Sequence, residues 1–206
     1  MGTHLSPFRP AVLKGMDAGY PEGLHRCLRA SERPALAIIG ETSLLSESLL
    51  GLICSVHCPG SIVLQTYDLF QRLKLGRRTV IGGFHSPMEK ECLRILLSGR
   101  SPVIICPART IDRMRIGADL RSFVASGRLS VVSPFSGSQR RPTARLAEER
   151  NRFVANLAEE VLIPFAAHKS KTERLAREIL GLKKKVITFP DGENESLICI
   201  GASPLL

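Results

Sequence analysis

The fold is decided by the stretch Arg78-Thr-Val-Ile-Gly-Gly-Phe-His-Ser-Pro87, which continues into Met88-Glu89. Residues 78–81 form a short, largely apolar run that predicts a strand, and residues 87–97 predict a helix. The two glycines between these elements allow a tight turn. A strand, a glycine turn and a helix in this order indicate one unit of an α/β fold.

The same alternation of strand and helix continues on both sides of this stretch. The sequence predicts strands at residues 35–39, 61–64, 78–81, 102–106, 129–133, 160–165, 185–189 and 197–200. It predicts helices at residues 23–30, 43–54, 67–74, 87–97, 120–125, 143–158 and 171–180. The strands are continuous apolar runs, which is typical of strands covered by helices on both faces. We therefore expect an α/β domain at residues 34–206 with a mostly parallel central sheet, preceded by a lead-in segment at residues 1–33.

Composition limits the class of protein. Of the 206 residues 44% are apolar, which is enough for a packed core and too many for a disordered chain. No apolar run approaches the roughly 20 residues that span a bilayer, and no signal peptide is visible, so we expect no membrane partner. The six scattered cysteines predict reduced thiols in a cytoplasmic protein. The net charge of +10 fits either a polyanion partner or a solvated basic surface.

The glycine turn is the first candidate site, because ligands of parallel sheets bind beyond the carboxyl ends of the strands. Gly82 and Gly83 let a ligand approach the backbone, and Ser86 with Glu89 predicts a capping box at the start of the helix. The free amides of such a helix start favour an anion, and a plain capped turn is the alternative. His85 is a candidate phosphate ligand or acid–base group, or else a structural hydrogen-bonding residue.

Two further candidate sites are basic. One is an arginine-rich segment at residues 140–152, suited to bidentate phosphate contacts. The other follows the predicted strand 160–165, where a second capping box stands beside two lysines. A solvated basic face and a simple capped helix are the respective alternatives. The residues concerned are Arg140, Arg141, Arg145, Arg150, Asn151 and Arg152 in the first segment, and Lys169, Ser170, Lys171 and Thr172 in the second.

Catalytic and cofactor motifs are missing from the sequence. It contains no Gly-x-Ser-x-Gly nucleophile elbow, no Gly-x-Gly-x-x-Gly turn, no Walker pattern and no acidic cluster for a metal pair. Cys54-Ser-Val-His-Cys58 suggests a metal site, but no second ligand pair has suitable spacing. We therefore expect no catalytic residues, no metal and no cofactor, and a binding protein rather than an enzyme.

Ordered motifs along the chain resemble the DNA-processing protein A (DprA, or Smf) family. The most specific is Arg150-Asn-Arg152, which resembles the start of a helix in that family. The flanking motifs, in the family's order, are Gly19-Tyr-Pro-Glu22, Ala37-Ile-Ile-Gly40, Thr79-Val-Ile-Gly-Gly83, Glu160-Val-Leu-Ile163 with Lys169-Ser170, and Phe189-Pro-Asp-Gly192. The resemblance covers about residues 19–192 and implies a Rossmann-like three-layer fold.

The resemblance also implies a function. It implies single-stranded DNA binding in a basic pocket, handover to the RecA recombinase during recombination, and a homodimer. The residues expected to contact DNA are Arg140, Arg141, Arg145, Arg150, Arg152, Lys169 and Lys171. Two alternatives stay open: a nucleotide sensor or nucleoside-phosphate-cleaving protein of the wider Rossmann-like group, and an interaction protein without a ligand.

The resemblance aligns residues 40–43 with the turn after the first strand of the family's fold. Gly40, Thr42 and Ser43 are therefore candidate phosphate ligands, although Glu41 and Thr42 stand where the family has Ser-Arg. We expect three loops, at residues 40–43, 82–86 and 169–172, to form one positively charged site beside residues 150–152.

Overall fold

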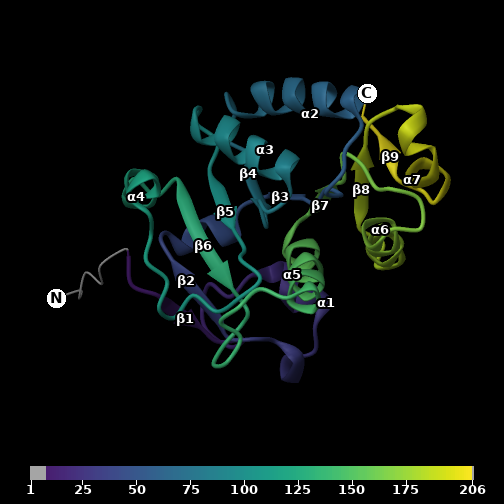
Figure 1. Ribbon diagram of the computed structural model, residues 1–206. Helices are drawn as coiled ribbons and strands as arrows, with labels where there is room; N and C mark the ends of the chain where they lie inside the picture. Colours follow the sequence, from purple (N-terminus) through teal and green to yellow (C-terminus); the bar gives the residue numbers. More distant parts are fainter. Residues whose placement is uncertain (1–7, 206) are drawn as a thin grey trace.

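The computed structural model describes residues 8–205, which form a nine-stranded sheet covered by helices (Figure 1). The strand order is β1-β2-β6-β5-β4-β3-β7-β8-β9. The strands are β1 (Ala11–Leu13), β2 (Leu36–Ile39), β3 (Leu49–Leu52), β4 (Thr79–Gly82), β5 (Val103–Ile105), β6 (Leu129–Ser133), β7 (Glu160–Leu162), β8 (Lys185–Thr188) and β9 (Ser203–Pro204). The helices are α1 (Glu22–Cys27), α2 (Gly60–Leu73), α3 (Pro87–Leu97), α4 (Ala118–Ala125), α5 (Ala144–Leu157), α6 (Lys171–Gly181) and α7 (Glu195–Cys199), with 3-10 turns η1 (Ala30–Glu32), η2 (Thr42–Ser46) and η3 (Gly192–Asn194).

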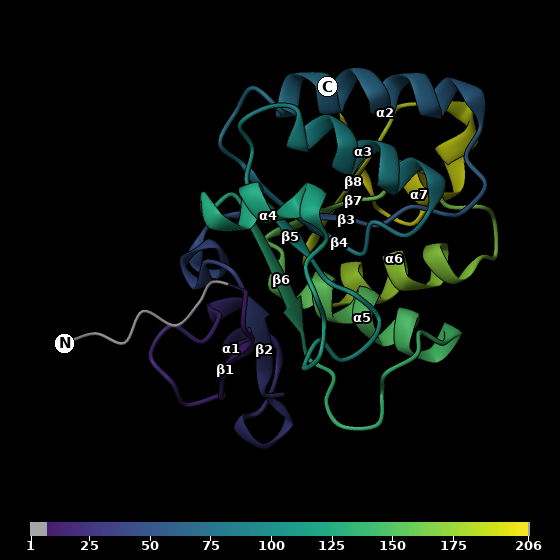
Figure 2. The same cartoon turned by 60° about the vertical axis from the view of Figure 1, so that its left-hand side comes forward.

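Helices cover both faces of the sheet, so the predicted three-layer fold is confirmed (Figure 2). β4 shows how the core is divided, since Val80 and Ile81 are both fully buried but lie in separate apolar clusters. Consecutive side chains of a strand point to opposite faces. Ile81 packs in the cluster that contains residues of α1, α5 and α6, and Val80 packs in the cluster that contains residues of α2, α3 and α4.

The predicted helix at residues 43–54 is wrong, because this segment holds η2 and the central strand β3. All four residues of β3 are buried, and a Cβ at Gly51 would lie 3.0 Å from the Cβ of Ala158. A short leucine-rich run that is buried on both faces has no periodicity that separates a strand from a helix. Tertiary packing therefore decided the structure of this segment.

Two predicted strands are helical. Residues 61–64 belong to α2, which runs unbroken into the predicted helix 67–74. Ile62, Thr66 and Phe70 are its buried residues, and this spacing of four is that of one helix face. The strand predicted at residues 197–200 is mostly α7, and β9 follows it as a two-residue strand.

The sheet is mostly parallel, as predicted, with six parallel pairings and two antiparallel ones. The antiparallel pairings join β1 to β2 and β2 to β6, with Ile39 opposite Val131. β1 comes from the segment expected to be a lead-in. Because β2 runs against its neighbour, its carboxyl end lies at the edge of the sheet where β6 begins.

Candidate functional site

Five loops meet at the carboxyl edge of the central parallel strands, where α/β folds bind ligands. They follow β3, β4, β5, β6 and β7 and comprise residues 53–59, 83–86, 106–117, 134–143 and 163–170. The second, fourth and fifth of these contain predicted site residues. The loop at residues 53–59 was not among the predicted site loops, because the sequence predicted a helix across β3.

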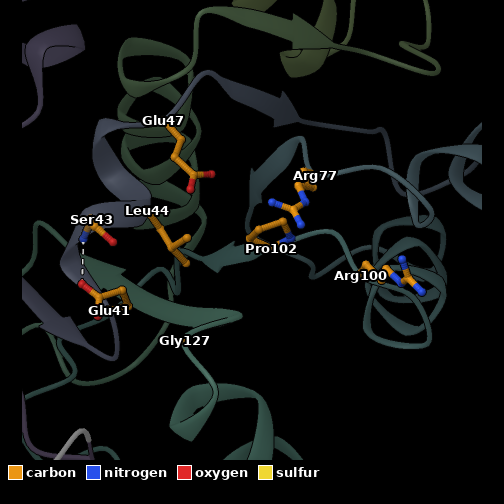
Figure 3. A pocket seen from close by; sticks show the side chains of 8 residues that line it. All are labelled: Glu41, Ser43, Leu44, Glu47, Arg77, Arg100, Pro102 and Gly127. Carbon is orange, nitrogen blue, oxygen red and sulfur yellow. Dashed lines mark hydrogen bonds between the residues drawn. The ribbon is translucent and has the colours of Figure 1, made fainter.

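Residues 40–43 lie at the opposite edge of the sheet. Gly40 packs at the start of β6, where a Cβ on it would lie 2.7 Å from the carbonyl oxygen of Leu129. A cavity of about 440 Å³ lies at this edge. Figure 3 shows its lining residues, which include Ser43. The expectation that Gly40, Thr42 and Ser43 join the other two loops is therefore wrong, because β2 is antiparallel. Phosphate contact by these residues stays a prediction.

The amides expected to bind an anion at the glycine turn are bonded to a carboxylate of the chain itself. Glu89 is only 4% exposed and accepts hydrogen bonds from the amides of Cys54, His85 and Ser86, at 3.0, 2.8 and 3.1 Å. The Ser86 hydroxyl accepts the amide of Glu89, so the predicted capping box is confirmed. The amides of His85 and Ser86 are thus not free for a phosphate, because an internal anion holds them.

Arg150 is buried at the centre of the carboxyl edge. Its guanidinium lies so close to Gly83 that a Cβ on this glycine would be 1.2 Å from Nη1. Nη1 donates to the carbonyl oxygen of Cys106 at 3.1 Å, and Nε donates to Oδ1 of Asn151 at 2.7 Å. Burial lowers the pKa of Arg150, and the carboxylate of Glu89 opposes this shift. Arg150 therefore joins the loops after β4 and β5, and it explains why a glycine stands at position 83.

The other predicted arginines of α5 pair with acidic neighbours. Arg145 pairs with Glu149 of the same helix at 2.7 Å, and Arg152 pairs with Glu178 of α6, also at 2.7 Å. Arg152 thus contacts α6, whereas Arg150 contacts the loops at the sheet edge. Of the three predicted site arginines in α5, Arg150 is therefore buried, whereas Arg145 and Arg152 form ion pairs on the surface of the helix.

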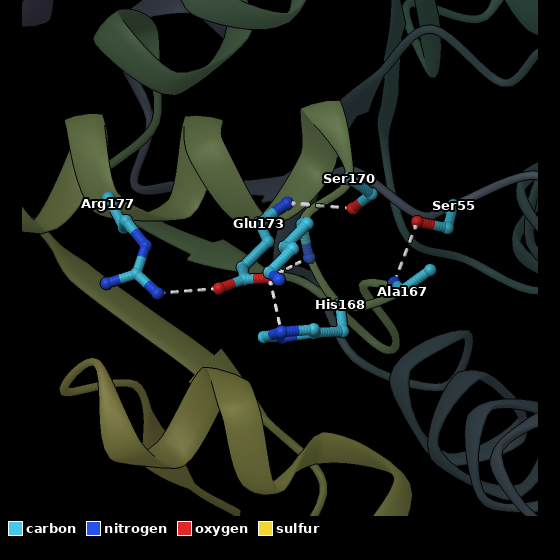
Figure 4. Close-up of polar contacts among 7 residues, drawn as sticks. Ser55, Ala167, His168, Ser170, Glu173 and Arg177 are labelled. Carbon is cyan, nitrogen blue, oxygen red and sulfur yellow. Dashed lines mark hydrogen bonds and ion pairs between the residues drawn. The ribbon is translucent and has the colours of Figure 1, made fainter.

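The start of α6 is capped by Ser170 (Figure 4), but the predicted capping box forms only in part, because the amide of Ser170 donates to the carbonyl oxygen of Ala167 and not to Glu173. The Glu173 side chain is 3% exposed, accepts the amide of Lys169 and pairs with Arg177 at 2.6 Å. Ser170 accepts the amide of Glu173 at 3.1 Å. An internal carboxylate again holds an amide that the sequence assigned to an external anion.

The two lysines of this segment have different environments. Lys171 pairs with Glu148 of α5 at 2.6 Å. Lys169 is exposed in a left-handed turn conformation, with a φ of +57°, and its side chain makes no ion pair within the described part of the chain. Thr172 is half-buried in the first turn of α6. Lys169 is therefore the lysine of the pair that is available to a ligand.

Three arginines surround a cavity of about 730 Å³ on the β5–β6 side of the carboxyl edge. Arg109 and Arg113 come from the loop after β5, and Arg140 comes from the loop after β6. All three are exposed, and none makes an ion pair within residues 8–205. Thr110, Asp112, Met114, Gly137 and Ser138 complete the lining.

The backbone of this cavity is held by contacts between its two loops. The amide of Thr110 donates to the carbonyl oxygen of Gln139 at 2.8 Å, and the buried hydroxyl of Ser133 donates to the carbonyl oxygen of Arg109 at 2.8 Å. Sequence analysis found Arg140 but not Arg109 or Arg113, which belong to no motif. Their position after the predicted strand 102–106 is the signal that could have found them.

The described residues contain neither a metal-binding group of side chains nor a helix that could span a membrane. Between residues 8 and 205, no group of three or more His, Cys, Asp or Glu side chains could hold a metal ion. The same part of the chain contains no helix with the length and apolarity needed to cross a membrane. Cys54 and Cys58, which suggested half of a metal site, are both free cysteines.

The fold and the site define a class of protein: a Rossmann-like α/β protein with an arginine-rich carboxyl edge. Within this class, the chain belongs to the DNA recombination-mediator protein A family, whose sequence profile matches residues 11–203. This match confirms the family inferred from the motifs. No curated protein sequence matches the chain.

Two solved structures share the fold. DNA processing protein A (DprA) from Streptococcus pneumoniae aligns with a TM-score of 0.77 and 18% identity, over 95% of this chain and 71% of that chain. DNA processing protein A from Helicobacter pylori aligns with a TM-score of 0.74 and 20% identity, over 99% of this chain and 93% of that chain. The second structure concerns the single-stranded DNA binding mode of the H. pylori protein.

Proposed function

We propose that this protein binds single-stranded DNA along the carboxyl edge of its sheet and acts in DNA processing and recombination. The observation that carries the proposal is the cluster of Arg109, Arg113 and Arg140 around one open cavity. Guanidinium groups suit phosphate oxygens, and three of them in one cavity suit a polymer with regularly spaced phosphates. Membership of the family and the DNA binding of the H. pylori relative support a polymeric anion over a single nucleotide.

The residues at this edge have separate tasks in the proposed complex. Arg109, Arg113 and Arg140 contact phosphates, and the exposed Arg141 follows Arg140 in the chain. Lys169, which is exposed in the loop after β7, is a further candidate on the same edge of the sheet. Arg150 is 5% exposed and acts as a positioning residue, because its guanidinium holds the loops after β4 and β5. Arg145, Arg152 and Lys171 contribute less to DNA binding, because each forms an ion pair with a glutamate.

Replacing Arg109 and Arg113 together with alanine tests the proposal. Three phosphate contacts predict that the logarithm of the binding constant falls with the logarithm of the salt concentration with a slope of about −2, because each contact to a single strand contributes about −0.7. The double variant should bind an oligonucleotide more weakly and show a slope of about −0.7. Fluorescence anisotropy at several salt concentrations measures both quantities.

The matched control replaces Arg145 and Arg152 together with alanine, which removes the same charge from ion-paired positions. This variant should keep most of the affinity and the slope of the original protein. Equal losses in both double variants would show that net charge, rather than the cavity, attracts DNA, and would overturn the assignment of the site. An absence of binding by the unchanged protein at low salt would overturn the function.

Family membership supports three further parts of the proposal: handover to the RecA recombinase, assembly as a homodimer and a location in the cytoplasm. Light scattering of the purified protein tests the dimer. Co-sedimentation with RecA on single-stranded DNA tests the handover, and retention of RecA at the level of a protein-free control would contradict it.

A further inference from the structure

Two cysteines in the loop after β3, Cys54 and Cys58, have no role in the proposed DNA site. They stand four residues apart in the loop segment Cys54-Ser-Val-His-Cys58, both are free cysteines, and each lies near enough to the other to shift its pKa. Cys54 is 7% exposed, whereas Cys58 is half-buried and reachable from solvent. The pair therefore combines one accessible thiol with one protected thiol in the same short loop.

The two thiols also differ in acidity. Cys58 stands two residues before the first residue of α2, and a helix start favours a thiolate. The neighbouring Cys54 thiol lowers the pKa of Cys58 below the ordinary thiol value, although partial burial opposes this shift. The neighbouring Cys58 thiol, followed by burial, raises the pKa of Cys54. Cys58 is thus the nucleophile of the pair, and Cys54 is the thiol held in place to react second.

The backbone around Cys54 is anchored, and the backbone around Cys58 is not anchored in the same way. The amide of Cys54 donates to Glu89, and the amide of Ser55 donates to the carbonyl oxygen of Phe165 at 3.2 Å. The Ser55 hydroxyl also accepts the amide of Ala167 at 3.4 Å. Residues 56 and 57 are exposed. Movement that brings the two sulfurs into bonding distance therefore comes from the Cys58 end of the loop.

We propose that Cys54 and Cys58 form an oxidation site that a hydroperoxide converts into a disulfide within the loop after β3. The Cys58 thiolate attacks the hydroxyl oxygen of the hydroperoxide, so that an S–O bond forms and the O–O bond breaks. The remaining oxygen takes up the proton that the Cys58 thiol released and leaves as an alcohol or water. The Cys54 sulfur then attacks the sulfenic sulfur of Cys58, an S–S bond forms, and the hydroxyl leaves with the Cys54 proton as water. The two sulfurs together lose two electrons, and the peroxide gains them. This reaction does not depend on the proposed DNA binding.

Tryptic digestion of the peroxide-treated protein tests the proposal directly. Cleavage after Arg29 and Arg72 leaves both cysteines in one peptide that contains no other cysteine, because Arg33 precedes a proline. Mass spectrometry without reduction should show that this peptide loses two hydrogen atoms after treatment with hydrogen peroxide. The loss should be reversed by a thiol reductant.

Single variants separate the two roles. In Cys54→Ser, Cys58 should accumulate as a sulfenic acid that dimedone traps, whereas in Cys58→Ser the buried Cys54 should resist oxidation. Cys199, an exposed and free cysteine on α7, provides the internal control for simple exposure. Oxidation of Cys199 with an unchanged Cys54–Cys58 peptide would overturn the proposal. A disulfide between Cys58 and the neighbouring Cys92 would overturn it as well.

Discussion

At the scale of single residues, the carboxyl edge is organised by two buried charged side chains, Glu89 and Arg150, that bond to the backbone of its loops. Glu89 holds three backbone amides from two loops, and the buried guanidinium of Arg150 lies against Gly83 and bonds to the end of β5. At the glycine turn, whose motif suggests phosphate binding, the backbone amides are therefore bonded to the protein's own Glu89 carboxylate. Arg109, Arg113 and Arg140, which make no ion pair within residues 8–205, are the phosphate-binding groups that we propose.

Gly83→Ala should destabilise the protein by about 3 kcal/mol, because the new methyl group and the Arg150 guanidinium cannot occupy the same space. Moving Arg150 would also break its bond to Cys106. Denaturant unfolding measures the effect. Gly181→Ala is the matched control, because nothing lies within 4 Å of a Cβ at that helical glycine, and it should be neutral or slightly stabilising. Equal stabilities of the two variants would contradict this account of Gly83.

At the scale of elements, a cluster of three charged side chains joins three strands at the amino edge of the sheet. Glu160 at the start of β7 pairs with Arg78 just before β4 and with Lys185 at the start of β8, the latter at 3.1 Å. Burial by itself would raise the pKa of Glu160, but the hydrogen bonds from Arg78 and Lys185 outweigh it and hold the pKa below the ordinary value of 4.5. These ion pairs link strands that are distant in the sequence.

This lowered pKa predicts an acid-sensitive contribution to stability. A carboxyl group whose pKa is lower in the folded state stabilises the fold above its unfolded pKa and loses this effect as the pH falls through its folded pKa. Glu160→Gln should therefore cost about 1–2 kcal/mol near neutral pH and progressively less below about pH 4. Urea unfolding across this pH range measures the difference. The exposed Glu195→Gln serves as the control, and a Glu160→Gln difference that is constant with pH would contradict the prediction.

At the scale of the whole molecule, the described part of the expected lead-in segment, which begins at Phe8, contains residues that are packed into the fold. β1 pairs with β2, and Tyr20 and Leu24 are 5% and 0% exposed. A Cβ at Gly23 in α1 would lie 2.7 Å from the carbonyl oxygen of Asn156, so α1 and the end of α5 are in close contact. The family profile likewise begins at residue 11.

A chain that begins at Pro34 should be less stable than a chain that begins at Phe8 by at least about 3 kcal/mol. The shorter chain loses the burial of Tyr20 and Leu24, and burying one large apolar side chain contributes about 1.5–3 kcal/mol. Denaturant titrations of both chains measure the difference, and a smaller slope would report less buried surface in the shorter chain. Indistinguishable curves would establish residues 1–33 as a true lead-in.

Local features of the sequence were sufficient to predict the class of fold and to identify the family. The apolar runs of β2, β4, β5, β6 and β8, the capping box at Ser86 and the serine cap at Ser170 depend on neighbouring residues, so the sequence predicts them correctly. The Arg150–Arg152 segment identified the family, and the loop at residues 83–86 was placed at the correct edge of the sheet. These features carry their structural meaning within a few residues of chain.

The tertiary structure alone decided the direction of β2 and the partners of the predicted site residues. Strand direction depends on pairing with β6, about ninety residues further along the chain, and it places Gly40 at the other edge of the sheet. The amide of Cys54 is held by Glu89, 35 residues away, and Arg150 bonds to Cys106, 44 residues away. Buried amides and charges take whichever partner the packed chain brings to them, and no local pattern in the sequence records that choice.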